Sequence, residues 1–177
     1  MRSGKTYVAN DLVETYGFQL MRFAGPLKDD IRAMDFPEAA IQAKPAWMRL
    51  LMQAYGQARR AVNPNHWVEQ LVRDLNNVRT MQLTAPRWAQ VLPVVIDDMR
   101  FDNEARALRA LNPDEFDVKL IRLLRVGDPG DVSHTSDVSE CDLDHYEDWD
   151  AIQQTEAGDL FNLTFGVREY LKLKHKV

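Results

Sequence analysis

VLPVVIDDMRF, residues 91–101, decides the fold, because a short apolar run ends there in two aspartates. The β-branched run at 94–96 predicts a buried strand. The sequence NEARALRAL follows at 103–111 and predicts a short helix. A strand followed by a helix is typical of an α/β fold with parallel strands. An aspartate at the end of such a strand is either a Mg²⁺ ligand or a polar strand end that caps the next helix.

The rest of the chain alternates in the same way. Helical periodicity is found at 5–16, 26–34, 46–62, 65–79 and within 157–174. Shorter apolar stretches that predict strands lie within 18–25, 116–126 and 149–154. Strands that alternate with helices predict an α/β fold with a mainly parallel sheet. In such sheets ligands bind at the carboxyl ends of the strands.

Three of the predicted helices have a clear apolar face. The face of the helix at 5–16 is expected to consist of Val8, Leu12, Val13 and Tyr16. The face of the helix at 46–62 is expected to consist of Trp47, Leu50, Leu51, Ala54, Tyr55 and Ala58. The face of the helix at 65–79 is expected to consist of Trp67, Leu71, Leu75 and Val78. We expect these faces to form part of the core.

Composition excludes several classes of protein. Hydrophobic residues make up 45% of the 177 residues and charged residues 28%, which predicts a water-soluble domain with a substantial core. No apolar run approaches the length of about 20 residues that a membrane-spanning helix needs. The single cysteine, Cys141, predicts a reduced thiol and a cytoplasmic protein. The net charge of −5 argues against direct binding of nucleic acid.

Gly4, Lys5 and Thr6 match the end of a phosphate-binding loop, GxxxxGK[ST]. They precede an amphipathic helix, whose first turn offers backbone N–H groups to a phosphate. In such a loop the lysine reaches the outer phosphates and the threonine hydroxyl binds Mg²⁺. The alternative is a glycine that caps an ordinary helix. The aspartates at 97 and 98 supply the carboxylate that a nucleotide site also needs, and this favours the phosphate loop.

Arginines provide further candidates for phosphate binding. Arg100 follows the two aspartates, Arg59 and Arg60 end a predicted helix, and Arg122 and Arg125 lie on a late strand. A guanidinium suits phosphate because it offers a planar fork of donors. For each pair the alternative is a solvated helix end or a surface ion pair. The histidines have no metal-ligand spacing, so a zinc site is not expected.

Several stretches together resemble one family, the deoxynucleoside monophosphate kinases of tailed phages, which are P-loop kinases. The residues that carry the resemblance are GKT at 4–6, FAGPLK at 23–28, YGQARRAVNPNHWVEQL at 55–71, VVIDDMRFDNEARAL at 94–108 and HTSDVSE at 134–140. The stretch DDMRFDNEA is the most specific of them. The resemblance implies a P-loop NTPase-like three-layer sandwich over residues 1–177 as a single domain. It further implies substrate-covering helices at about 35–80 and a lid or flap at about 125–148.

The resemblance also implies a reaction and a set of site residues. Such kinases transfer the γ-phosphoryl group of ATP to a deoxynucleoside monophosphate, with Mg²⁺. By resemblance, the catalytic residues are Lys5, Asp98, Arg100 and Arg125. The ATP site comprises Gly4, Lys5, Thr6, Arg122 and Arg125, and the Mg²⁺ ligands are Thr6, Asp97 and Asp98. The monophosphate site comprises Ala24, Pro26, Leu27, Lys28, Arg59, Arg60, Trp67 and Arg100.

The sequence departs from the family pattern in three places. The first strand and first glycine of the loop are absent before GKT, so we expect the natural protein to begin upstream of Met1. Asp102 stands where the family often has proline, and IQQT at 152–155 stands where an Ile-x-Asn pattern is common. Two alternatives to the kinase therefore remain: a truncated or degenerate P-loop protein without catalysis, and a P-loop kinase for another small phosphate acceptor.

The resemblance suggests two further properties. The family suggests a homodimer, and a phage-encoded enzyme would act in the cytoplasm of the infected host. The bases that the enzyme accepts do not follow from the sequence, because base choice depends on the shape of the pocket.

Overall fold

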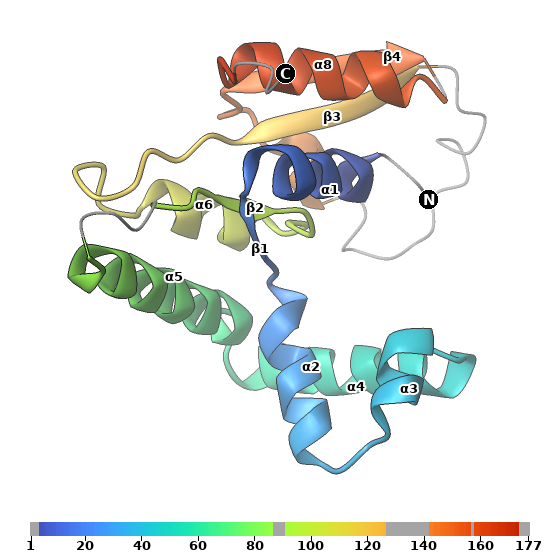
Figure 1. The fold of residues 1–177 in the computed structure, drawn as a ribbon. Helices are drawn as coiled ribbons and strands as arrows, with labels where there is room; N and C mark the ends of the chain where they lie inside the picture. The colour runs from blue at the N-terminus through green and yellow to red at the C-terminus, as the bar shows by residue number, and fades with distance from the viewer. Residues whose placement is uncertain (1–3, 87–90, 127–141, 157, 174–177) are drawn as a thin grey trace. The chain divides into compact units, whose positions relative to one another are not determined.

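The chain folds into two compact units. The computed structural model describes residues 4–86, 91–126, 142–156 and 158–173 (Figure 1). Unit 1 consists of Met1–Leu20 and Leu92–Val177, and unit 2 consists of Met21–Val91. The boundary between the units falls within the first strand.

Unit 1 contains both helices and strands. In chain order they are α1 (Lys5–Tyr16), β1 (Gln19–Met21), β2 (Val94–Ile96), α6 (Asp102–Arg109), β3 (Ile121–Val126), the 3-10 helix η2 (Asp142–His145), β4 (Ala151–Glu156) and α8 (Leu160–Tyr170). The last residue of β1, Met21, belongs to unit 2.

The strands of unit 1 form two short pairs, β1 with β2 and β3 with β4. β3 and β4 are parallel, with Ile121 opposite Ala151 and Val126 opposite Glu156. α8 packs on one face of β4. Gly166 of α8 lies so close to Gln153 of β4 that a Cβ added to the glycine would be only 2.4 Å from Oε1 of Gln153. Within the described ranges, neither β2 nor β3 has a second strand neighbour.

The core of unit 1 joins α1 to α8. Its fully buried residues are Val8, Leu12, Tyr16, Leu163 and Val167. Val95 of β2 and Ile121 and Leu123 of β3 pack against the same cluster, so both strand pairs contribute to one core. An ion pair between Asp11 of α1 and Arg168 of α8 also joins the two helices.

Both ends of α1 are set by glycines in the left-handed region. Gly4 precedes the helix with φ 81°, and Gly17 follows it with φ 76°. At the C-terminal end, the N–H of Gly17 donates to Val13 O at 3.1 Å, and the N–H of Phe18 donates to Leu12 O at 3.2 Å. The bond from Gly17 to Val13 is that of an αL motif, and it satisfies one of the last four carbonyls of the helix.

Unit 2 is helical beyond the end of β1. It contains α2 (Ala24–Ala33), α3 (Glu38–Ala43), α4 (Ala46–Val62) and α5 (His66–Thr84). One core cluster consists of Ile31, Ile41, Met48 and Met52. Trp67 of α5 is also buried, and its indole N–H donates to the carbonyl of Gly56 in α4 at 3.3 Å. The short helix α3 was not predicted, since its six residues are too few to show a period.

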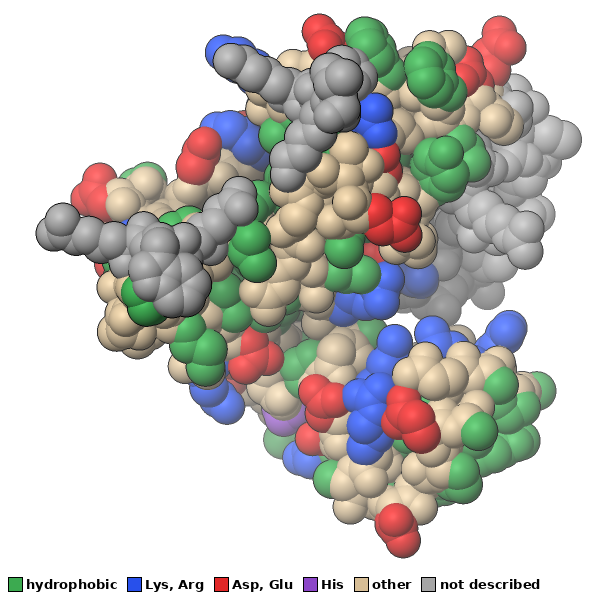
Figure 2. Space-filling model, in the orientation of Figure 1, with side chains coloured by type: hydrophobic (Ala, Val, Ile, Leu, Met, Phe, Trp, Pro, Cys, Tyr) green, Lys and Arg blue, Asp and Glu red, His purple; other side chains and the backbone are tan. Residues whose placement is uncertain are grey.

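The predicted apolar face of α4 is partly wrong. Trp47 and Leu50 are 51% and 66% exposed, whereas Met48 and Met52 are buried. Figure 2 shows hydrophobic side chains gathered where α3 meets the start of α4. α4 is apolar around most of its circumference, so periodicity did not identify the face that points inward. The apolar face predicted for α5 is confirmed, since Trp67, Leu71 and Leu75 are buried.

The structure confirms a mixed α/β fold with a parallel strand pair. The predicted helix at 46–62 and strand at 94–96 have the observed bounds. The region predicted to cover the substrate, about 35–80, falls within unit 2. Most of the region predicted as a lid or flap, residues 127–141, lies outside the described residues. No helix in the described part of the chain combines the length and apolarity that crossing a bilayer requires.

Candidate functional site

Gly4 is held at the start of α1 by two separate constraints. Its φ of 81° is a conformation that side chains with a Cβ rarely adopt. In addition, a Cβ at this position would lie 2.6 Å from Cδ2 of Leu163 and 3.3 Å from Cδ2 of Leu160. Leu163 is itself buried in the core and has little room to move. Glycine is therefore required here both by the backbone and by the close packing of α8.

Lys5 and Thr6 occupy the first turn of α1, and both are exposed. The first turn contains no acidic residue, and the residue at its N-cap position, Gly4, has no side chain that could cap the helix. Such a turn carries the positive end of the helix dipole together with backbone donors. It is therefore suited to an anion, as the sequence pattern predicts.

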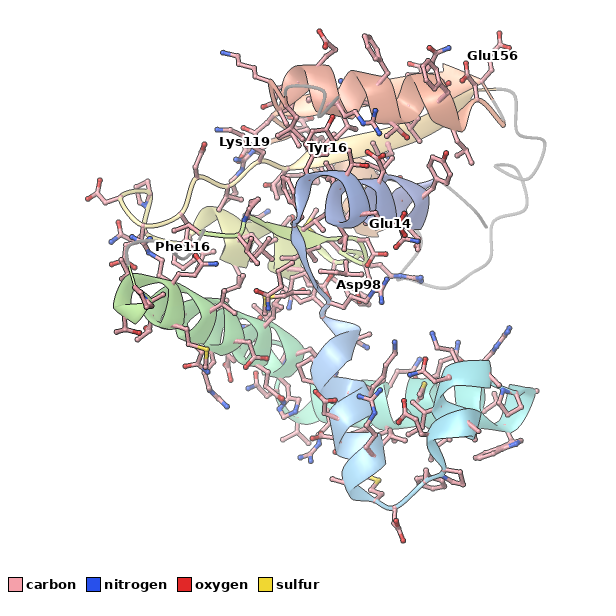
Figure 3. All side chains as sticks on the ribbon, viewed as in Figure 1. Glu14, Tyr16, Asp98, Phe116, Lys119 and Glu156 are labelled. Carbon is pink, nitrogen blue, oxygen red and sulfur yellow. The ribbon has the colours of Figure 1, made fainter. Side chains whose placement is uncertain are left out.

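The second group of predicted residues follows β2. Asp97 is buried, Asp98 is half-buried and Arg100 is exposed. In Figure 3, Asp98 lies on the same side of unit 1 as Glu156, where β4 ends, and Lys119 lies on the opposite side. α1 also begins on the side where β3 and β4 end (Figure 1). The first turn of α1 and the aspartates after β2 thus share the side of unit 1 at which ligands of α/β sheets bind.

A residue that was not predicted, Glu104, organises the connection from β2 to α6. Its carboxylate accepts hydrogen bonds from the N–H of Arg100 at 2.7 Å and from the N–H of Phe101 at 3.1 Å. The side chain is buried, with 3% of the residue exposed. A glutamate at the third position of a helix is a known signal for capping, but the sequence does not reveal that this carboxylate is buried.

Arg122 and Arg125 lie on β3. The guanidinium of Arg122 forms an ion pair with Asp144 at 2.8 Å and lies 5.8 Å from the ring centroid of Trp149. Its side chain is therefore engaged by residues of and near η2, and its role toward ATP stays a prediction. Arg125 is opposite Thr155 in the pairing of β3 with β4. Its side chain lies outside the described part of the structure.

The residues predicted to border the monophosphate begin α2. The set is Ala24, Pro26, Leu27 and Lys28. Pro26 is buried in the first turn, where its missing N–H costs no helical hydrogen bond. Leu27 packs closely on α4, because a Cβ at Gly56 would lie 3.1 Å from its Cδ1.

Arg59 belongs to a polar network that links α2 to α4. Its Nε and Nη2 donate to the hydroxyl of Tyr55 at 2.9 and 2.7 Å. That hydroxyl in turn donates to Asp30 of α2 at 2.8 Å. Arg60, the neighbouring predicted residue, is half-buried beside Gly56. The network holds the side chain of Arg59, and the phosphate-binding role of Arg59 stays a prediction.

Trp67 was predicted to lie in the substrate-covering helices. It lies in α5 and is 2% exposed, with its ring 6.1 Å from that of Tyr55 and 4.6 Å from that of His66. A ring this buried orders α4 against α5. Contact between this ring and a substrate stays a prediction.

The candidate residues therefore form two sets. Unit 1 holds the start of α1 and the connection after β2, and unit 2 holds the start of α2 and the end of α4. Within the described ranges, no three histidine, cysteine or carboxylate side chains cluster as a metal site would require. Basic side chains are visible over the helices of unit 2 in Figure 2.

Comparison with known proteins adds no assignment. No protein-family model matches the chain, and the comparison with curated proteins gives no match. The functional argument therefore depends on the residues themselves.

Proposed function

We propose that this protein is an ATP-dependent kinase that phosphorylates deoxynucleoside monophosphates to diphosphates. One observation carries the proposal. Gly4, in a left-handed conformation, places Lys5 and Thr6 in the first turn of α1, on the side of unit 1 where Asp98 follows β2. A lysine and a hydroxyl at a helix start, with a carboxylate after a neighbouring strand, are the groups that phosphoryl transfer needs.

The residue types suit this chemistry. Because the acceptor is already a phosphate oxygen, the reaction needs little base catalysis and depends on positioning and charge neutralisation. Lys5 binds the outer phosphates of the nucleotide, and the N–H groups of α1 bind phosphate oxygens. Arg100 orients the phosphate of the acceptor. Arg125 and Arg122 neutralise charge on the side of ATP.

The donor atoms in unit 1 fit Mg²⁺. Thr6 offers a hydroxyl and Asp98 a carboxylate, and Mg²⁺ prefers such oxygen ligands. Mg²⁺ at nucleotide sites takes only one or two protein ligands, because substrate phosphates and waters supply the others. The small number of carboxylates is therefore what a nucleotide kinase requires. Thr6 and Asp98 would hold the ion, which would supply positive charge against the phosphates and reduce the charge that Lys5 must balance.

The proposal includes a P-loop sandwich as the complete fold. In that fold one more parallel strand lies between β2 and β3. Consistent with this, β2 and β3 each have a single strand neighbour among the described residues, and both pack on the α1–α8 core. A strand between them would pair backbone groups that β2 and β3 otherwise leave without a strand partner.

The direct test is to incubate the protein with Mg-ATP and each deoxynucleoside monophosphate in turn. The assay should include a form extended by a strand and loop upstream of Gly4. We expect a deoxynucleoside diphosphate from at least one acceptor. If neither form yields a diphosphate from any acceptor, the kinase proposal is wrong. Turnover of a different phosphate acceptor would support the alternative P-loop kinase instead.

Lys5→Ala tests the phosphate loop. Removing a charge that stabilises the transition state should lower kcat on the order of 100- to 1000-fold, with little change in the urea midpoint. Lys119→Ala is the matched control, because Lys119 is a lysine of unit 1 paired only locally with Asp117 at 2.6 Å. An unchanged rate for Lys5→Ala would show that Gly4–Thr6 is not a phosphate loop.

A further inference from the structure

Glu104 makes one hydrogen bond more than helix capping requires. α6 begins at Asp102, with Phe101 as its N-cap residue. A glutamate at the third helical position caps by accepting the N–H of the N-cap residue, and Glu104 does this with Phe101. Its second and shorter bond, at 2.7 Å, accepts the N–H of Arg100, which lies outside the helix. Helix capping explains the hydrogen bond from Phe101. It does not explain the hydrogen bond from Arg100.

The hydrogen bond from Arg100 is accepted by a carboxylate whose burial is unfavourable. A carboxylate that is 3% exposed has lost most of its water, and such burial is unfavourable unless charge-assisted hydrogen bonds replace that water. One oxygen, Oε2, accepts both N–H groups. Two successive peptide groups that point at the same atom have little freedom to rotate. The backbone that carries the side chain of Arg100 is therefore fixed.

We propose that Glu104 is a positioning residue that sets the direction in which Arg100 leaves the connection between β2 and α6. This inference rests on the proposed function only where it gives Arg100 the acceptor phosphate to bind. Glu104 is too buried to bind substrate, so it acts through Arg100. Without its carboxylate, the peptide groups of Arg100 and Phe101 can rotate, and the direction in which the Arg100 side chain leaves the backbone is no longer set.

The first experiment measures the position of the backbone and needs no enzymatic activity. The backbone amide signals of Arg100 and Phe101 are recorded by ¹H–¹⁵N NMR in the parent protein, Glu104→Gln and Glu104→Ala. Both protons should resonate downfield in the parent, because a carboxylate accepts them. Glu104→Gln should move both signals upfield, and Glu104→Ala should move them further. If only Phe101 responds, Glu104 is a helix cap alone and the inference is wrong.

The second experiment measures catalysis. Misplacement of Arg100 in Glu104→Ala should lower kcat/KM for the deoxynucleoside monophosphate on the order of 100-fold, with KM for ATP unchanged. The double variant Glu104→Ala with Arg100→Ala should be no slower than Arg100→Ala alone, because the two residues act as one. Independent losses that multiply in the double variant would overturn the inference.

Controls separate this inference from other failures. Glu14→Gln removes an exposed charge from α1 and should leave both amide signals and both kinetic constants unchanged. If Glu104→Ala does not fold, the amide signals and kinetic constants of Glu104→Gln test the inference instead. Glutamine keeps the size of the glutamate side chain and one acceptor oxygen. If the parent protein has no kinase activity, the proposed function fails, and the amide signals still decide whether Glu104 fixes Arg100.

Discussion

The cores of units 1 and 2 are built from different residues. In unit 1, α1 and α8 pack together and against strands through branched side chains and one tyrosine, and a glycine permits the closest approach. In unit 2, helices pack on helices through isoleucines and two methionines. Both clusters contain β-branched side chains, which have few rotamers, but the buried residues of the unit 2 cluster also include methionines, which are flexible and fill irregular gaps.

This difference implies a difference in tolerance. A core of branched side chains, in which a Cβ at Gly4 would come within 2.6 Å of a leucine, should respond sharply to added atoms. A helical core with methionines should absorb added atoms better and respond mainly to removed ones. The two units should therefore be sensitive to opposite kinds of substitution. The first two variants below examine that expectation, and the other two compare the polar contacts of the units.

Trp67→Ala should have the largest effect. It removes a ring that is 2% exposed and the hydrogen bond to Gly56, so the free energy of unfolding should fall by about 3–5 kcal/mol. Urea unfolding followed by circular dichroism measures the loss. Trp47→Ala, in the same unit but 51% exposed, is the control and should cost far less. Equal losses of unfolding free energy would mean that burial does not determine how much each tryptophan contributes to stability.

Gly4→Ala should come next. The positive φ costs about 1–2 kcal/mol, and forcing a Cβ against Leu163 adds about 1–3 kcal/mol. Gly17→Ala is the matched control, because Gly17 has φ 76° and a Cβ added there would meet no atom within 4 Å. The difference in urea midpoint between the two variants measures the close approach. If they are equally destabilised, unit 1 is not tightly packed at α8.

Asp150→Asn tests unit 1 through its pH dependence. Asp150 accepts the N–H of Leu120 at 2.6 Å and pairs with Arg109 at 2.9 Å. Burial alone would raise the pKa of Asp150, but these two partners outweigh it and hold the pKa below its usual value. A lowered pKa stabilises the fold above the unfolded pKa of about 3.9, and this stability is lost as pH falls through the folded value.

We therefore expect Asp150→Asn to cost about 1–3 kcal/mol at pH 7 and progressively less below about pH 4. Urea unfolding at a series of pH values measures this. Asp148→Asn should have little effect at any pH, because the Asp148 side chain is 73% exposed although it also pairs with Arg109. A loss for Asp150→Asn that stays constant down to pH 2 would contradict the lowered pKa.

Tyr55→Phe should have the smallest effect. It removes the hydroxyl that joins Asp30 to Arg59 while keeping the ring, so we expect a loss of about 0.5–1.5 kcal/mol in unit 2. Hydrogen exchange read by mass spectrometry should rise in α2 and α4. Tyr146→Phe serves as the control, because it removes a tyrosine hydroxyl from unit 1 and should leave exchange in α2 and α4 unchanged. Faster exchange in α8 alone would contradict the role of this network.

Much of the secondary structure could be predicted, for identifiable reasons. The helix at 46–62 has a proline just before it and an Asn-Pro pair just after it, so its limits are marked in the sequence. The strand at 94–96 is β-branched and ends in aspartates. The inward face of α4 could not be predicted, because Trp47 and Met48 are both apolar and only packing decides between them.

The candidate site was predictable where chemistry depends on residue type. Lysine, threonine, aspartate and arginine near a helix start and a strand end can be recognised from their order. Glu104 could not be recognised, because its importance lies in its burial and in the N–H groups that it accepts. Likewise, the partners of Arg122 come from residues about twenty positions away in the chain.

The parallel pairing of β3 with β4 has a consequence for evolution. β3 ends at Val126 and β4 begins at Ala151, and their register is fixed by the pairing itself. The entropy of closing a connection grows only with the logarithm of its length, so doubling the connection costs only about 0.6 kcal/mol. A longer connection between these strands should therefore cost unit 1 little, provided that it keeps Asp144 and Asp150, whose contacts with Arg122 and Leu120 tie this part of the chain to β3 and to the residue before it.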